Sequence, residues 1–150
     1  MICPMKSLFG ISFFIMVWLL AAVVFPPWAR AQDTEIPMPP VSEPPVLVRA
    51  EMCETIERYL PVNQGVVFSI SLGRVYCFTA FDPVHEETVI YHRWYRQDRL
   101  VSSARLVLNP PKWASFSSIQ LRSLDKGPWR VEIVDSRENL IKILRFSISD

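Results

Sequence analysis

The chain of 150 residues is nearly neutral, with 16 Lys and Arg against 15 Asp and Glu, and half of it is hydrophobic. This length favours one domain around one modest core. Basic residues are interspersed with acidic ones, so the chain lacks the basic stripe that neutralises phosphates in nucleic-acid-binding proteins. With 4 Gly in the whole chain, a glycine-rich phosphate-binding loop is not expected either.

The first 31 residues have the features of a secretory signal peptide. The uncharged apolar run 8–25 follows Lys6, and Ala29-Arg30-Ala31 fits the pattern of a cleavage site. At about 1.5 Å per residue, the run also approaches the length of a membrane span, so a signal anchor is the alternative. In both cases we expect a periplasmic or extracellular location, with membrane contact only through an uncleaved N-terminal segment.

Residues 32–45 form a Pro-rich spacer between the signal and the domain. Their five Pro and three acidic residues favour extended conformations and supply nothing for a core. We therefore place the folded domain at residues 46–150. Removal of the signal takes away Lys6 and Arg30 and leaves 14 basic residues against 15 acidic ones, so the mature chain is close to neutral.

Cys53 and Cys77 remain as an even pair when Cys3 leaves with the signal. In an exported protein such a pair is typical of a disulfide, which is our prediction for these two residues. The alternative is two buried thiols that pack as small apolar side chains. Neither His85 nor His92 has finger-type spacing to them, so zinc is disfavoured, and we expect no metal and no cofactor.

From Val46 onward, short alternating segments separated by turn residues predict an all-β fold. There is no βαβ alternation, so we predict a small antiparallel β-sandwich, immunoglobulin-like, with about seven or eight strands. Residues 51–60 have some helical character, but we favour an irregular continuation of the first strand. The predicted strands are 46–53, 66–72, 74–81, 88–96, 100–108, 114–121, 128–135 and 140–149.

Two tryptophans are predicted to anchor the core. Alternation places Trp94 beside His92 on one face of its strand, and Trp129 beside Val131 on one face of another. A buried tryptophan removes up to about 200 Å² from water, which makes these rings large contributors to stability.

Several short motifs occur in an order that resembles a bacterial family known as domain of unknown function 2914. The resemblance covers about residues 46–150. It implies a small β-rich module with no agreed activity and no catalytic residues to carry over. The motifs are Gly73-Arg74-Val75-Tyr76-Cys77-Phe78-Thr79, His92-Arg93-Trp94-Tyr95, Trp113 with Ser115 to Ser118, Gly127-Pro128-Trp129-Arg130-Val131-Glu132-Ile133-Val134-Asp135, and Phe146-Ser147-Ile148.

The candidate binding residues are Tyr91, Arg93 and Tyr95, on the face opposite Trp94, together with Arg96 at the adjoining turn. Exposed aromatic rings flanked by Arg are able to stack on a sugar or to form a protein hot spot. The alternative is that both faces of this strand are buried, which would make the tyrosines core residues. We predict a non-catalytic binding or interaction module whose partner is a cell-envelope protein or glycan.

Two rival functions follow from other residues. His92 is the one candidate base for an envelope hydrolase, although the Ser-rich stretch 115–118 lacks a Gly elbow and no catalytic triad is recognisable. The second rival is a structural piece of a larger complex that adds an edge strand to the sheet of a partner. The strand 140–149 is the candidate edge, since it contains no Pro and only Lys142 and Arg145 as charged residues.

Overall fold

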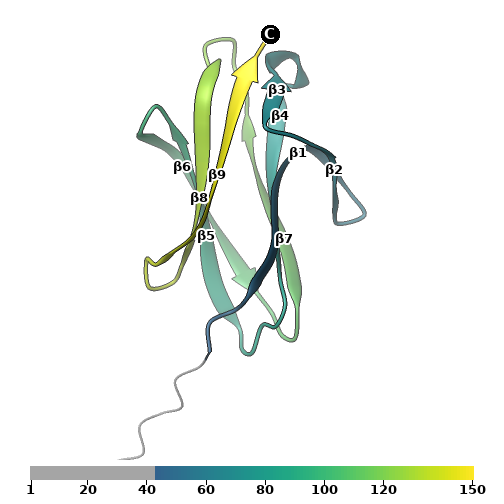
Figure 1. Ribbon diagram of the computed structural model, residues 1–150, viewed down its shortest axis with the longest axis vertical. Coiled ribbons are helices and arrows are strands. Elements are labelled where there is room, and N and C mark those ends of the chain that lie inside the picture. The colour runs from purple at the N-terminus through teal and green to yellow at the C-terminus, as the bar shows by residue number, and fades with distance from the viewer. Residues whose placement is uncertain (1–42) are drawn as a thin grey trace, which may run out of the picture. The chain divides into compact units, whose positions relative to one another are not determined.

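Strands make up nearly all the regular structure of residues 43–150, the part of the chain that the computed structural model describes (Figure 1). The all-β class predicted from the sequence is confirmed. The signal at 1–31 and most of the spacer at 32–45 lie outside the described residues. Within the described part, no helix is long and apolar enough to span a membrane. The elements are β1 (Leu47–Glu57), β2 (Leu60–Gln64), β3 (Val67–Ser69), the 3-10 turn η1 (Ile70–Leu72), β4 (Arg74–Phe81), β5 (Thr88–Arg96), β6 (Arg99–Leu108), β7 (Trp113–Gln120), β8 (Gly127–Asp135) and β9 (Leu140–Ser149).

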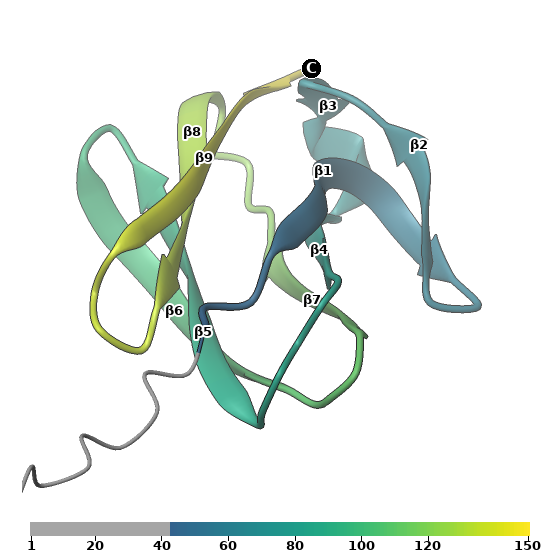
Figure 2. The same ribbon diagram turned by 60° about the horizontal axis from the view of Figure 1, so that its bottom comes forward.

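The strands form two sheets that pack as a β-sandwich (Figure 2). Sheet A has the strand order β2-β1-β4-β7, and sheet B has the order β3-β9-β8-β5-β6. Neighbouring strands are antiparallel except for β3 and β9, which are parallel. The segment 140–149, predicted as an edge strand, is not at an edge throughout, because β9 pairs with β8 on one side and with β3 at Ser147–Ser149 on the other.

The β1–β2 hairpin is the main feature that the sequence did not predict. β1 continues to Glu57, as the favoured continuation of the first strand suggested, and then turns through Arg58 and Tyr59. Both turn residues have positive φ angles, 48° and 62°, a conformation that Asn and Gly usually supply in two-residue hairpins. Because Arg and Tyr give no such signal, β2 was missed. The predicted strand 66–72 is also shorter, because β3 ends at Ser69 and residues Ile70–Leu72 form a 3-10 turn that Gly73 caps at φ 69°.

Cys53 and Cys77 are free thiols, so the predicted disulfide is absent from the structure. The pairing of β1 with β4 explains why. Met52 lies opposite Cys77, and Cys53 lies opposite Tyr76. Side chains alternate between the two faces of a sheet, so Cys77 points into the sandwich while Cys53 points to the outer face of sheet A. A disulfide needs Cβ atoms that face each other about 4 Å apart, which this register excludes.

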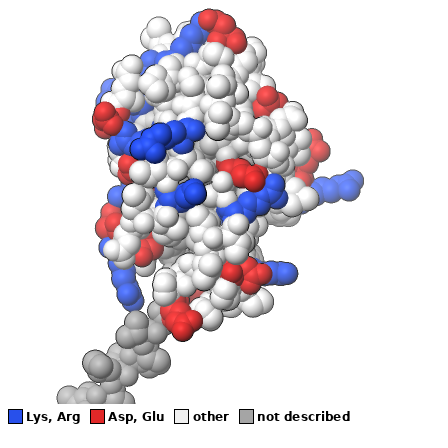
Figure 3. All heavy atoms as spheres, in the orientation of Figure 1, with Lys and Arg blue, Asp and Glu red and all other residues white. Residues whose placement is uncertain are grey.

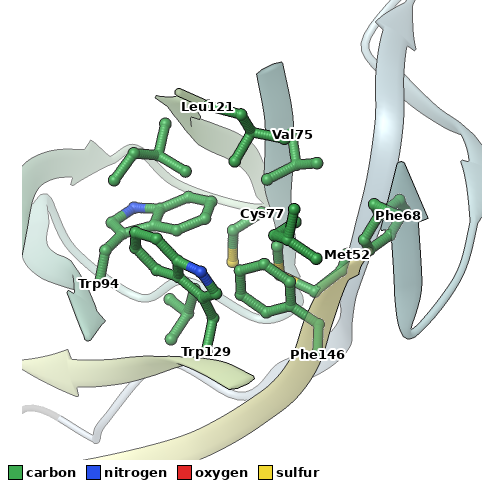
Figure 4. Close-up of a cluster of buried hydrophobic side chains, with 11 residues drawn as sticks. Met52, Phe68, Val75, Cys77, Trp94, Leu121, Trp129 and Phe146 are labelled. Atoms are coloured by element: carbon green, nitrogen blue, oxygen red, sulfur yellow. The ribbon is translucent and has the colours of Figure 1, made fainter. Parts of the chain in front are cut away.

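The core lies between the sheets and is rich in aromatic side chains (Figure 4). Trp94 is completely buried and Trp129 is 4 % exposed. The ring of Phe146 contacts both of them: it lies 6.1 Å from the ring of Trp94 in an edge contact and 6.2 Å from the ring of Trp129 in a stacked one. Such offset and edge-to-face arrangements add to the free energy of burial. A second, smaller cluster contains Phe81, Val84, Ile90, Leu108 and Ile133.

Replacement of Trp94 by Ala should lower the free energy of unfolding by about 3–5 kcal/mol, because it leaves a large cavity in the core. Denaturant unfolding measures this loss. Trp113→Ala is the matched control, since Trp113 is 41 % exposed and its removal should cost much less. Equal losses in the two variants would contradict the packing described here.

Both cysteines should behave as protected free thiols. Burial raises the pKa of the Cys53 thiol to about 11 and raises that of Cys77 as well, so neither forms much thiolate at neutral pH. Alkylation should be slow in the native protein and should modify both residues after unfolding. An intact mass lower by two hydrogens, together with a melting temperature that drops on reduction, would instead show a disulfide.

Candidate functional site

A polar cluster around His92 crosses the core from sheet B to sheet A. The imidazole is fully buried. Its Nδ1 lies 2.9 Å from Oγ of Ser117 on β7, and its Nε2 lies 3.2 Å from Oγ1 of Thr79 on β4. Trp94 Nε1 donates to the same Ser117 oxygen at 3.0 Å, and Thr79 donates to the carbonyl of Ser115 at 3.4 Å. Side chains from three strands, β4, β5 and β7, are thus joined by hydrogen bonds around His92.

The donors and acceptors of this cluster fit one proton arrangement. Trp94 Nε1 can only donate, so Ser117 accepts from it, and the hydroxyl hydrogen of Ser117 has an acceptor within the cluster when it goes to Nδ1 of His92. The hydrogen on Nε2 of His92 then goes to Thr79, which in turn donates to the Ser115 carbonyl. When His92 is the neutral Nε2–H tautomer, every polar hydrogen of the cluster has an acceptor.

The surroundings of His92 favour a structural role. Burial lowers the pKa of the imidazole to about 4, which keeps it neutral near pH 7. Its hydrogen-bond partners are Ser and Thr hydroxyls, and it lines none of the four best-formed surface hollows of residues 43–150. A hydrolytic base must reach its substrate, whereas the His92 side chain is fully buried within the part of the chain that the structure describes.

The stability of the domain should fall as the pH drops from about 6.5 to about 4. Within this window the unfolded chain protonates His92 while the folded chain does not, since burial lowers the folded-state pKa from 6.5 to about 4. The contribution of neutral His92 to the free energy of unfolding should be complete above pH 6.5. It should decrease by about 3 kcal/mol by the time the pH has fallen below about 4.

Urea unfolding at a series of pH values measures this effect. The free-energy difference between wild type and His92→Gln should shrink toward acid pH. His85→Asn is the control for loss of a histidine outside the buried cluster, because His85 is exposed at the surface. A difference for His92→Gln that is independent of pH would contradict the buried neutral imidazole.

The outer face of sheet B carries three of the four predicted binding residues. Tyr91, Arg93 and Tyr95 alternate along β5 with the buried residues, and all three are half-buried. The guanidinium of Arg93 lies 5.9 Å from the centre of the Tyr91 ring and bonds Glu138 at 2.5 Å. The hydrogen bond to Glu138 raises the pKa of Arg93. The tyrosines are therefore neither fully exposed nor core residues.

Arg130 of β8 completes this surface. Its guanidinium stacks 4.3 Å from the centre of the Tyr95 ring. It also bonds Glu132 at 2.8 Å and Asp98 at 2.5 Å. Such contacts hold the guanidinium plane in one orientation, which lowers the entropy cost of using it for recognition. Arg130 was not predicted as a site residue, although alternation in 128–135 with Trp129 inward implies that it faces outward.

Arg96 does not join the other three predicted binding residues. It sits at the end of β5, opposite Trp129, and donates to the carbonyl of Leu124 and to that of Lys126 at 3.5 Å. It also forms an ion pair with Asp125 at 3.6 Å. Arg96 therefore holds the loop before β8 in place. The sequence could not show this, because the loop lies almost thirty residues further along the chain.

A hollow of about 260 Å³ adjoins the Arg–Tyr surface. Tyr95, Gln97, Pro128, Arg130 and Arg145 are among the residues that line it. Arg145 of β9 lies directly opposite Arg130, and it has no ion-pair partner within residues 43–150. Like charges directly opposite each other on one face of a sheet are unfavourable. The hollow is thus lined by the unpaired cation of Arg145, by the guanidinium of Arg130 with its partner Asp98, and by the Tyr95 ring.

Charged groups on the face of the molecule shown in Figure 3 do not gather into a patch of one sign. On the face shown in Figure 3, Lys and Arg side chains lie interspersed with Asp and Glu side chains. Residues 43–150 contain no group of three or more His, Cys, Asp or Glu side chains that could hold a metal ion.

These features define an all-β, two-sheet domain with a sealed core histidine and an ordered Arg–Tyr outer face. Residues 87–148, which run from just before β5 to the end of β9, match the family model described as protein of unknown function (DUF2914). The resemblance seen in the sequence is confirmed over this segment, and the description of the family assigns no activity. A comparison with curated proteins found no match.

Proposed function

We propose that this protein is an exported, non-catalytic interaction module of the bacterial cell envelope. We propose further that its ligand surface is the outer face of sheet B, built from Tyr91, Arg93, Tyr95 and Arg130. The observation that carries the proposal is that the charged side chains of this surface are held in fixed orientations. Both arginines are held against tyrosine rings by acidic residues from neighbouring strands and turns.

The contrast between the two faces of β5 favours binding over catalysis. The inward residue His92 is sealed and neutral, with all its hydrogen-bonding capacity used. The outward residues present guanidinium planes and the free parts of tyrosine rings to solvent. Side chains that are already held in place lose little conformational entropy when they bind a partner. Tyr and Arg are also enriched at binding hot spots.

An envelope glycan or an envelope protein suits this surface. A sugar ring is able to stack on the Tyr95 side of the hollow while its hydroxyl or acidic groups meet Gln97 and Arg145. A protein partner would use the same guanidinium and tyrosine groups as anchors. Location outside the cytoplasm is supported by the apolar run 8–25 and the cleavage pattern at 29–31.

Binding to envelope components should be lost in the double variant Tyr91→Ala, Tyr95→Ala. The change removes both rings and the packing that orders Arg93 and Arg130. Glycan arrays and pull-downs from an envelope fraction are the measurements. Tyr59→Ala is the matched control, since Tyr59 is 75 % exposed in the β1–β2 turn.

Binding of the double variant that equals that of wild type would exclude this face as the ligand surface. The intact mass of the exported protein tests its location in the same preparation, because a mature start at Gln32 shows cleavage of the signal.

A further inference from the structure

β7 is an edge strand with an unusual composition. It is the last strand of sheet A and pairs with β4 on one side only. Its eight residues, Trp113–Gln120, include no charged residue and no Pro. The pairing with β4 runs from Phe81 opposite Trp113 to Arg74 opposite Gln120 without a bulge. The strand therefore offers a regular, uncharged row of backbone donors and acceptors to another strand.

The other free edges of the two sheets carry features that discourage strand addition. β6, the last strand of sheet B, has Arg99 and Arg105 on it and a bulge between the pairs of Trp94 and Tyr95. β2 and β3 are five and three residues long. Charges, bulges and short length are the devices by which proteins protect sheet edges. Among the described strands, β7 is the long edge that lacks them.

The sheet surface next to β7 exposes two large apolar side chains, and it also carries Arg74, which donates to the Ser118 hydroxyl at 3.1 Å. Phe116 is 39 % exposed and its ring lies 6.3 Å from that of Tyr76 in an edge contact. Trp113 is 41 % exposed and lines a hollow of about 320 Å³ together with Val48 and Ala114. Exposed apolar groups beside an open strand edge increase the free energy gained when a partner covers that edge.

We propose that two copies of the protein associate through antiparallel pairing of β7 with β7, with Phe116 opposite Phe116 of the second copy. The two four-stranded A sheets then form one continuous sheet, and a two-fold axis passes between the two Phe116 residues. In this register Ala114 faces Ser118 of the second copy. Trp113 faces Ile119, and Ser115 faces Ser117.

The uncharged composition of β7 is what favours a second copy as the partner. Self-pairing brings a strand against its own sequence, and any charge near its centre meets a like charge at short range. Self-pairing of β6 would bring arginines of the two copies close to one another, whereas β7 contains no charged residue. The Phe116 pair extends the edge contact with Tyr76 into an aromatic ladder across the two copies.

Paired charge substitutions at Ala114 and Ser118 test both the association and its register. In the variant Ala114→Lys, Ser118→Lys each lysine faces a lysine of the second copy. We expect the dissociation constant to rise at least about tenfold. In Ala114→Lys, Ser118→Asp each lysine faces an aspartate, which also lies beside Arg74 of its own chain, and association should be clearly stronger than in the Lys–Lys variant. Sedimentation velocity over a range of concentrations measures both, and thermal unfolding verifies that each variant is folded.

Ser103→Lys is the matched control, because it places the same charge on the exposed edge of β6 and should leave the dimer intact. A wild-type protein that stays monomeric up to submillimolar concentrations would overturn the proposal. So would equal weakening by the Lys–Lys and Lys–Asp variants, or dissociation of the dimer by Ser103→Lys. Glycan or partner binding through Tyr91 and Tyr95 is measured separately, so either proposal can fail alone.

Discussion

A chain of hydrogen bonds through the apolar core joins the two sheets. It runs from Trp94 through Ser117 to His92 and on to Thr79, so that side chains of β5 meet side chains of β7 and β4. The burial of apolar surface around it is large but non-directional, whereas these bonds have narrow ranges of length and angle. A buried donor or acceptor left without its partner costs about 1–3 kcal/mol, so sliding one sheet over the other is strongly disfavoured. The chain therefore fixes how the sheets stack.

The same constraint orients the outer face. His92 must point inward to make its two hydrogen bonds, and alternation along β5 then requires Tyr91 and Arg93 to point outward. On the outside, the acidic partners come from turns: Glu138 from the β8–β9 turn holds Arg93, and Asp98 from the β5–β6 turn holds Arg130. The inner network thus sets the direction of the outer side chains, and the turns set the orientation of their charged ends.

Alternation and turn residues were sufficient to predict most of the strands and the inward direction of Trp94. What they could not give is the pairing of strands far apart in the sequence. The predicted disulfide failed for this reason, because the register of β1 against β4 sends Cys53 and Cys77 to opposite faces. β2 was missed because Arg58 and Tyr59 adopt positive φ angles without the usual turn residues. Arg130 was missed because its contact with Tyr95 depends on β8 lying beside β5.

β7 connects the inner network to the edge of the sandwich. Its inward residue Ser117 takes part in the hydrogen-bond chain, and its backbone pairs without interruption with β4. Such a strand loses little conformational entropy when another strand is added, because it is already ordered. The open edge and the buried histidine are thus linked physically, because the strand whose Ser117 binds His92 in the core is also the strand whose far side is left unpaired in sheet A.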